Sequence, residues 1–507
     1  MSAGFDAGIR APADAFERRR LAAVGPVAWN NPLPDAPYHL VIVGAGPAGL
    51  AAAGAAAALG ARVALIERHL LGGTCFNTGC VPSKTLLRTA RVYEQMREAA
   101  RYGARSPADI QVDFAAAMTR LRRVRSHLTA TTSVRQLTAS GVDVYFGNTQ
   151  FEGRDRLSVN GQPLQFDKAL IATGARPHVP DIPGLKQAGF LTNASVFDLT
   201  ELPPRLLVIG GGPLGCELAQ AFQRFGSKVT IAQNLPLFLE HEERDAAQTL
   251  SDAFGRDGIE VRLNTTATAV RVEGADKVVD LVNGDYRSSV RVDAIFAGVG
   301  RRPNVEGLML EAAGVDCDRI RGVKVDDHLC SSNPRIYAAG DVCLEARYTD
   351  IAEESARIAV RNALFGGRER LSRRIVPWCT YTDPEIAHVG MYVREANARG
   401  IPIKTFTVPM HQVDRAVIDG EQDGFVKIHV REGSDRILGA TIVSRDAGDM
   451  ISQVTLAMVA GVGLRTLAKV IHAYPTKTEA IREAALAYNR TRITPRVVAR
   501  LRRWLAP

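Results

Sequence analysis

One unit, a strand followed by a glycine-rich loop, a helix and a second strand, occurs twice in this chain. The first copy predicts a strand over residues 39–43, a loop over 44–49, a helix to about residue 59 and a strand over 62–66. The second copy predicts the same elements over residues 205–209, 210–215, to 225 and 228–232, an offset of 166 residues. Such a repeat predicts two βαβ dinucleotide-binding folds, and hence two different dinucleotides.

Each loop has three glycines at the spacing that phosphate binding requires. The first makes the tight turn, the second lets a pyrophosphate approach the backbone, and the third allows close packing of the helix. We therefore expect cofactor contacts at Gly44, Gly46 and Gly49 in the first copy and at Gly210, Gly212 and Gly215 in the second. Glu67 ends the second strand of the first copy, where its carboxylate is placed to accept hydrogen bonds from ribose hydroxyls.

The length of 507 residues predicts roughly three domains, and an apolar content of 46% is ample for folded cores. The pattern along the chain predicts an α/β protein with two Rossmann-like domains and a C-terminal α+β domain. An irregular stretch is expected over residues 377–385, before the strands and helices of that last domain. The predicted boundaries are an N-terminal arm without periodicity at 1–37, a first nucleotide domain at 38–183 that returns at 301–370, a second nucleotide domain at 184–300, a dimerisation domain at 371–489 and a basic tail at 490–507.

The formal net charge of +9 comes largely from the tail, where residues 490–507 hold six arginines and no acid. Without them the charge falls to +3, so nucleic-acid binding is not expected. Ile493, Val497, Leu501 and Trp504 or Leu505 would lie near one face of a tail helix, which predicts packing on the protein itself more readily than contact with anionic lipid. The sequence has no plausible membrane span and no basic-then-apolar leader at its N-terminus, which favours a cytoplasmic protein.

Two cysteines with four residues between them follow the first nucleotide unit. Cys75 and Cys80 fall in the run GGTCFNTGCVPSK at residues 72–84, and Cys80 precedes a helix-compatible segment. The positive end of a helix stabilises a thiolate, and a turn at Gly79 would let the two sulfurs meet, although two unpaired buried thiols would fit the spacing as well. Five scattered cysteines are expected to be buried apolar thiols, and no metal site is expected: Cys216, Cys317, Cys330, Cys343 and Cys379.

The run GGTCFNTGCVPSK resembles the active-site motif of the flavoprotein pyridine nucleotide–disulfide oxidoreductases. The resemblance continues through residues 172–174, 298–304, 339–341 and 472–479, in the order expected for the family, and covers roughly residues 39 to 490. It implies an enzyme that binds FAD and NAD(P)H and passes electrons through a Cys75–Cys80 disulfide.

The resemblance also implies roles for individual residues. The first loop and Glu67 would hold the adenosine half of FAD, Asp341 a ribityl hydroxyl, and Lys84, paired with Glu217, would lie near the reactive flavin nitrogen. Further cofactor contacts are implied at Gly73, Thr74, Thr173, Gly174, Gly300 and Gly340. The second loop would hold NAD(P)H, and Gln233, which ends its strand without a negative charge, leaves the choice between NADH and NADPH open.

For the thiol chemistry, the resemblance implies that Cys80 faces the flavin and Cys75 exchanges with substrate. His472 would act as the acid–base that manages the Cys75 proton, held by Glu479 and supplied by the second subunit of a homodimer. A different reading makes Glu479 structural, because residues 476–479 fit a helix capping box.

The acceptor is expected to be a small-molecule disulfide or Hg(II). The residues of the motif and the run 474–476 are more similar to those of mercuric reductase. That enzyme, however, has a vicinal cysteine pair near its C-terminus, and no cysteine follows Cys379 here. Dihydrolipoyl dehydrogenase is the alternative, but it often has a second histidine where Tyr474 stands. A hypothesis of another class is a flavin-binding module that has lost catalysis and is tethered by its basic tail.

Overall fold

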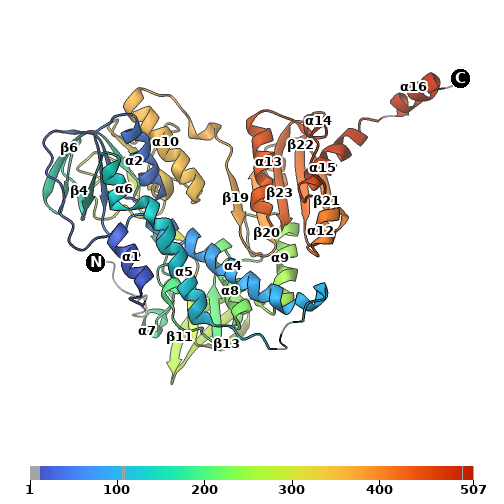
Figure 1. Cartoon of the computed structure of the whole chain (residues 1–507), viewed down its shortest axis with the longest axis horizontal. Helices are drawn as coiled ribbons and strands as arrows, with labels where there is room; N and C mark the ends of the chain where they lie inside the picture. The colour runs from blue at the N-terminus through green and yellow to red at the C-terminus, as the bar shows by residue number, and fades with distance from the viewer. Residues whose placement is uncertain (1–11, 106, 108, 494, 506–507) are drawn as a thin grey trace. The chain divides into compact units, whose positions relative to one another are not determined.

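The computed structural model describes residues 12–105, 107, 109–493 and 495–505, and it consists of two compact units (Figure 1). The first comprises the described residues of Met1–Asn234 and Asn264–Arg374, and the second those of Leu235–Leu263 and Ile375–Pro507. Each unit has its own hydrophobic core.

A parallel sheet with strand order β3-β2-β1-β6 organises the first unit, and β18 pairs with the other side of β6. Its strands are nearly continuous runs of buried apolar residues, as expected for a sheet covered on both faces. The helices α2 and α10 pack against one another, and their alanines share a core cluster with one face of the sheet. The strands are β1 (Tyr38–Val43), β2 (Val63–Glu67), β3 (Val142–Phe146), β6 (Gln162–Ile171) and β18 (Ile336–Ala338), and the helices are α2 (Pro47–Ala58) and α10 (Thr349–Phe365).

Shorter antiparallel strands extend this sheet and connect its parts. β4 (Thr149–Phe151) pairs with β5 (Arg156–Val159), which pairs with the start of β6. The other antiparallel pairs are β7 (Ala175–Pro177) with β15 (Arg301–Pro303), and β16 (Cys317–Asp318) with β17 (Gly322–Val323).

The second copy of the repeat forms a smaller parallel sheet, in which β8 pairs with β9 and β14. β8 (Arg205–Ile209), β9 (Lys228–Ala232) and the end of α8 (Pro213–Phe225) have the bounds expected from the sequence. β14 (Ala294–Ala297) lies on the other side of β8 from β9. A three-stranded antiparallel sheet with α7 (Leu185–Ala188) lies beside these strands: β11 (Thr266–Glu273), β12 (Asp276–Asn283) and β13 (Tyr286–Val292).

The two cysteines of the redox run lie on consecutive helices, α3 (Gly73–Thr78) and α4 (Cys80–Arg97). α4 packs against α5 (Phe114–Leu128) and α8, and α6 (Val134–Ala139) follows α5. The predicted irregular arm is wrong for part of its length, because α1 (Ala15–Val24) forms a helix that packs against α5. The helix begins after Asp14, whose side chain accepts a hydrogen bond from the Glu17 amide at 2.8 Å.

The second unit is built on a five-stranded antiparallel sheet with strand order β19-β20-β23-β22-β21. The strands are β19 (Pro377–Thr380), β20 (Glu385–Gly390), β21 (Ile403–Pro409), β22 (Phe425–Arg431) and β23 (Ile437–Ser444). The stretch predicted to be irregular therefore contains a strand, because β19 pairs with β20. The remaining elements are α9 (Arg244–Asp257), β10 (Glu260–Arg262), α11 (Val393–Ala398), α12 (Asp414–Ile418), α13 (Ala447–Val459), α14 (Leu464–Leu467) and α15 (Glu479–Arg490).

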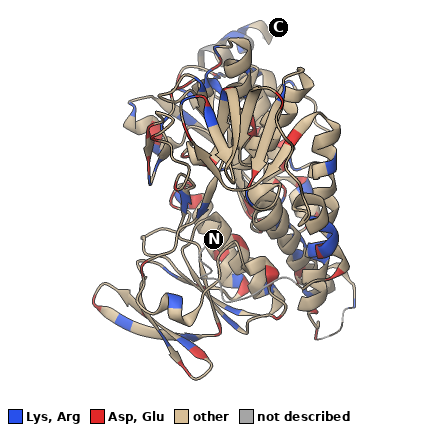
Figure 2. Cartoon of the chain, turned by 90° about the vertical axis from the view of Figure 1, so that its left-hand side faces the viewer, with Lys and Arg blue, Asp and Glu red and all other residues tan. Residues whose placement is uncertain are grey.

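The basic tail forms the expected helix, α16 (Pro495–Leu505). Ile493, Val497, Trp504 and Leu505 are exposed, and the side chain of Leu501 lies outside the described residues. Among the helices that the structure describes, none is long and apolar enough to cross a membrane. Acidic and basic residues are interspersed along the helices and strands (Figure 2), which agrees with the near balance of charge outside the tail.

Candidate redox site and nucleotide-binding loops

Cys75 and Cys80 are both free thiols in the structure, and each thiol shifts the pKa of the other. Cys75 lies in the middle of α3, and Cys80 is the first residue of α4, with its Sγ 3.4 Å from the Thr349 hydroxyl oxygen. The Cys75 thiol is the largest cause of a lowered pKa at Cys80, and the positive charge of Lys84 also lowers it. The same pairing, together with burial, raises the pKa of Cys75. Cys80 is therefore favoured as the thiolate while Cys75 keeps its proton.

The structure brings together the two thiols, but the disulfide between them stays a prediction. Of the other five cysteines, Cys216 is buried as expected, and burial raises its pKa. The remaining four are half-buried. No cluster of His, Cys, Asp or Glu side chains among the described residues has the arrangement of a metal site.

Lys84 and Glu217 form an ion pair between α4 and α8. The Lys84 ammonium lies 2.9 Å from one carboxylate oxygen of Glu217 and 2.8 Å from the other. The Glu217 side chain is 3% exposed, whereas that of Lys84 is 34% exposed. The carboxylate thus fixes a cation one helical turn from Cys80, and the pairing is the one that the family resemblance implied.

The two glycine loops are built alike. A Cβ on Gly49 would lie 1.8 Å from the Gly44 carbonyl oxygen, and a Cβ on Gly215 would lie 2.3 Å from the Gly210 carbonyl oxygen. Gly44 and Gly210 have φ values of 105° and 102°, which only glycine adopts readily. A Cβ on Gly46 would meet only the Gly73 Cα, at 3.8 Å, and one on Gly212 would meet no atom of the described chain within 4 Å. Both loops therefore leave open space at the middle glycine, as the close approach of a pyrophosphate to the backbone requires.

The residues that end the two second strands hold their loops in the same way. Glu67 accepts a hydrogen bond from the Ala45 amide at 2.9 Å, and Gln233 accepts one from the Gly211 amide at 2.9 Å. The second oxygen of Glu67 accepts from the backbone amides of Arg68 and His69, each at 2.9 Å. The equivalence of the two copies thus extends from the glycines to the side chain that braces each loop.

Buried polar groups converge near Asp341. Burial raises the pKa of Asp341, against the charge of Arg301, whose Nε lies 3.4 Å from the carboxylate. The Nε atoms of Arg301 and Arg347 are buried and have no hydrogen-bond partner among the described residues. Such unsatisfied donors beside a carboxylate fit a ligand rich in hydroxyl and phosphate oxygens, as FAD is. Neither arginine is among the candidate residues predicted from the sequence, although Arg301 stands in the run 298–304.

The motifs implied by the resemblance also meet in space. The Thr173 hydroxyl donates to the Asn304 carbonyl at 2.7 Å, and the Asn304 amide donates to the Gly174 carbonyl at 2.9 Å. Arg301 donates to the Thr74 hydroxyl at 3.4 Å. The remaining predicted glycines have positive φ, namely 55° at Gly73, 99° at Gly300 and 74° at Gly340.

His472 and Glu479 belong to the second unit, and no hydrogen bond joins them in the described chain. The His472 Nε2 lies 2.8 Å from the side-chain nitrogen of Gln453, on α13, and its Nδ1 is buried without a partner among the described residues. Glu479 is the first residue of α15, and the predicted capping box does not form: Thr478 is the N-cap, and it makes no side-chain capping bond. The catalytic roles of His472 and Glu479 stay predictions, and sequence reasoning missed Gln453, for which no motif gives a signal.

Tyr474 is the most accessible polar group of the same segment. Its side chain is 70% exposed, and its hydroxyl donates to Asp414 at 2.8 Å. The Asp414 carboxylate raises the pKa of this phenol.

Comparison with known proteins gives two family matches that together cover most of the chain. Residues 38–363 match the pyridine nucleotide-disulphide oxidoreductases, and residues 376–485 match the dimerisation domain of the same enzymes. A mercuric reductase of Lysinibacillus sphaericus is 33% identical over 453 residues, which are 89% of this chain and 83% of that one. A dihydrolipoyl dehydrogenase of Chlamydia muridarum is 33% identical over 458 residues, 89% of this chain and 96% of that one.

Solved structures with the same fold are also found. The HOCl-induced flavoprotein disulfide reductase RclA of Escherichia coli has a TM-score of 0.79 at 31% identity, covering 88% of this chain and 99% of that one. That protein has also been solved as a Cu(II) complex. LpdA of Mycobacterium tuberculosis has a TM-score of 0.81 at 29% identity, covering 89% of this chain and 99% of that one.

Proposed function

The chain belongs to the pyridine nucleotide–disulfide oxidoreductases, FAD-dependent enzymes that use NAD(P)H, and from this premise we propose that Cys75 and Cys80 form its redox-active disulfide. The observation that carries the proposal is the placement of the two thiols: Cys75 lies on α3, and Cys80 is the first residue of α4, one turn from the ammonium of Lys84. In keeping with this placement, the neighbouring thiol lowers the pKa of Cys80 and raises that of Cys75. A pair of this kind separates two roles: Cys80 rests as the thiolate, whereas Cys75 holds a proton that a base must remove before its sulfur can attack a substrate.

The other residues of the site support the same assignment. Lys84, held by Glu217, keeps a positive charge beside the thiolate of Cys80. We propose that the first glycine loop, Glu67 and Asp341 hold FAD and that the second loop and Gln233 hold NAD(P)H. When bound, FAD would supply the two-electron chemistry that links the hydride of NAD(P)H to the disulfide.

Proton handling is assigned to His472. The match of residues 376–485 to the dimerisation domain supports a homodimer, and we propose that His472 of one subunit serves the Cys75 thiol of the other. The buried Nδ1 of His472 lacks a partner among the described residues. A turn of the Glu479 side chain toward this nitrogen would fix the tautomer in which Nε2 accepts a proton.

For the acceptor, we propose a soft metal ion in the manner of mercuric reductase, with a small disulfide such as lipoamide as the second candidate. Several curated relatives are mercuric reductases, and thiolates are the ligands that soft ions prefer. The dihydrolipoyl dehydrogenases at similar identity favour the second candidate. The cytoplasmic location expected from the sequence stays a prediction, which cell fractionation would check.

The experiment is a steady-state panel of NADH and NADPH oxidation with Hg(II), Cu(II), lipoamide and glutathione disulfide as acceptors. We expect the metal-dependent rate to exceed the disulfide-dependent rates, and Cys75→Ser and Cys80→Ser to abolish it. Cys317→Ser is the matched control, because that half-buried thiol lies on β16, outside the pair and outside both glycine loops. Activity that survives loss of Cys75 and Cys80 would refute the disulfide mechanism, and bound flavin that NAD(P)H fails to reduce would indicate a binding module.

A further inference from the structure

The helix α1 lies before the region that matches the family, yet it contacts α3, the short helix that contains Cys75 and leads to Cys80. The family match begins at residue 38, and α1 ends at Val24. Val24 is fully buried, and its carbonyl accepts a hydrogen bond from the Leu71 amide at 2.9 Å, two residues before α3 begins. This contact joins the N-terminal segment to the start of the redox run.

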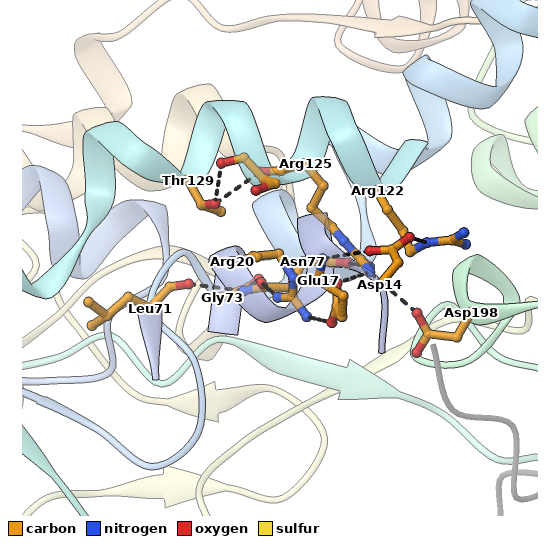
Figure 3. A network of polar contacts seen from close by, with 11 residues as sticks. Asp14, Glu17, Arg20, Leu71, Gly73, Asn77, Arg122, Arg125, Thr129 and Asp198 are labelled. Carbon is orange, nitrogen blue, oxygen red and sulfur yellow. Dashed lines mark hydrogen bonds and ion pairs between the residues drawn. The ribbon is translucent and has the colours of Figure 1, made fainter. Parts of the chain in front are cut away.

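Two charged side chains of α1, Glu17 and Arg20, point inward and belong to a polar network around Asn77 (Figure 3). Glu17 is 6% exposed and Arg20 is 5% exposed. Arg20 donates through its Nε to Glu17 at 3.0 Å, and it donates through Nη1 to the side-chain oxygen of Asn77. Glu17 also accepts from Arg125 of α5 at 3.0 Å. Arg20 of α1 therefore hydrogen-bonds both a carboxylate of its own helix and a side chain of α3.

Asn77 lies between Cys75 and Cys80 and is the buried residue of α3. Its side-chain amide donates to the carbonyls of Leu71 at 3.0 Å and Gly73 at 2.9 Å. Its own carbonyl accepts from Arg125 at 3.0 Å. Asn77 thereby fixes both the entry to α3 and the turn that leads to Cys80, and Arg20 fixes the orientation of Asn77.

The charges of this network balance. Three acids and three arginines take part, and all are buried or half-buried: Asp14, Glu17, Asp198, Arg20, Arg122 and Arg125. Buried ion pairs add little net stability compared with apolar packing, but their geometry is specific. A planar guanidinium that donates in several fixed directions is suited to holding one backbone arrangement.

We propose that α1 is a positioning element for the redox pair, in which Arg20 acts through Asn77 to keep Cys75 of α3 against Cys80 of α4. This inference rests on the proposed function, because it assumes that the two thiols form a disulfide. Holding the thiols together raises their effective concentration, which favours the disulfide over the dithiol. Loosening α3 makes the disulfide easier to reduce.

The test measures the reduction of the Cys75–Cys80 disulfide in the FAD-loaded full chain, equilibrated with dithiothreitol and its oxidised form. Dithiothreitol gives two electrons and two protons to the protein disulfide and closes to its own cyclic disulfide, and mass spectrometry of alkylated peptides counts the dithiol. We expect Arg20→Met to shift the equilibrium constant about tenfold toward the dithiol, or about 30 mV for this two-electron couple.

Arg19→Met is the matched control, because Arg19 is the neighbouring arginine of α1 and is exposed. It should leave the equilibrium within about twofold of the wild type. Should Arg20→Met fail to fold, the double variant Glu17→Gln/Arg20→Met preserves the charge balance, and Arg20→Lys preserves the charge without the forked donors. Each is expected to give the same shift.

Leu157→Ala separates positioning from general stability, because Leu157 is a fully buried residue of β5 outside the network. It should lower Tm without moving the thiol equilibrium. The inference is overturned if Arg20→Met and Arg19→Met have the same thiol–disulfide equilibrium constant with dithiothreitol. It is also overturned if Leu157→Ala shifts this constant as much as Arg20→Met does. A wild type that forms no Cys75–Cys80 disulfide under oxidising conditions would instead sink the proposed function.

Discussion

Alanine at the third glycine of each loop should weaken the binding of one cofactor and leave the binding of the other unchanged. A Cβ on Gly49 would lie 1.8 Å from the Gly44 oxygen, and real Cβ atoms essentially never approach closer than 3.0 Å. The obstacle is backbone, so the start of α2 has to move by about 1.2 Å. In catalytic sites, a misplacement of about 1 Å lowers the rate roughly 100-fold. A loss of FAD affinity of the same size corresponds to about 2.7 kcal/mol, which is what we expect for Gly49→Ala.

Gly54 supplies the control within the same helix. A Cβ there would meet no described atom within 4 Å, so Gly54→Ala should keep FAD and stabilise α2 by about 1 kcal/mol. Gly215→Ala, with its Cβ 2.3 Å from the Gly210 oxygen, should keep FAD and lose affinity for NAD(P)H.

Fluorescence titration of the apoprotein with FAD, followed by titration of the FAD-loaded protein with NADPH and NADH, measures each affinity separately. Equal FAD affinity in Gly49→Ala and Gly54→Ala would refute the steric argument. Loss of FAD in Gly215→Ala would refute the assignment of one dinucleotide to each copy.

Three further outcomes follow from single groups. Lys84→Met should lower the free energy of unfolding by about 3–5 kcal/mol, because it removes the ammonium from a carboxylate that is 3% exposed. Adding Glu217→Gln should recover part of this loss. Urea unfolding measures both, and a double variant no more stable than Lys84→Met would contradict the prediction. Gln233→Glu should shift the ratio of kcat/KM toward NADH at least tenfold, since a carboxylate repels the 2′-phosphate of NADPH, and an unchanged ratio would refute it. Burial lowers the pKa of His388 to about 3, so its contribution to stability is present above about pH 6.5 and is lost toward pH 3, at about 1.4 kcal/mol per pH unit. The free energy of unfolding of His388→Gln should therefore depend less on pH in that window. Equal slopes of this free energy against pH in the variant and the wild type would be evidence against a buried neutral imidazole.

The parts of the fold that the sequence predicted are those with a strong local pattern. β8 and β9 are short apolar runs on either side of a glycine loop, and the structure has them at the expected residues. The Lys84–Glu217 pair joins residues 133 positions apart, so it could be expected only from the resemblance to a family. Spacing alone left open whether Cys75 and Cys80 meet.

What the sequence missed depends on contacts between distant residues. α1 has no apolar stripe that marks a buried face, because two of its three buried residues are Glu17 and Arg20. Their burial depends on Arg125, more than one hundred positions away, and charged residues without a visible partner are read as solvated. The contact of His472 with Gln453 is likewise tertiary, and it places the imidazole nitrogen against an amide that no motif marks.

The two strand-end side chains, Glu67 and Gln233, carry a consequence for how such an enzyme changes its coenzyme. Each loop is braced by a single side-chain oxygen, which a carboxylate and a carboxamide offer equally well. The other terminal atom therefore differs between the copies without disturbing the turn that it stands beside. A glutamine codon and a glutamate codon are one nucleotide apart. On the proposed assignment of NAD(P)H to the second loop, a lineage could therefore change its preferred coenzyme in a single step while the hydrogen bond that holds the loop stays intact.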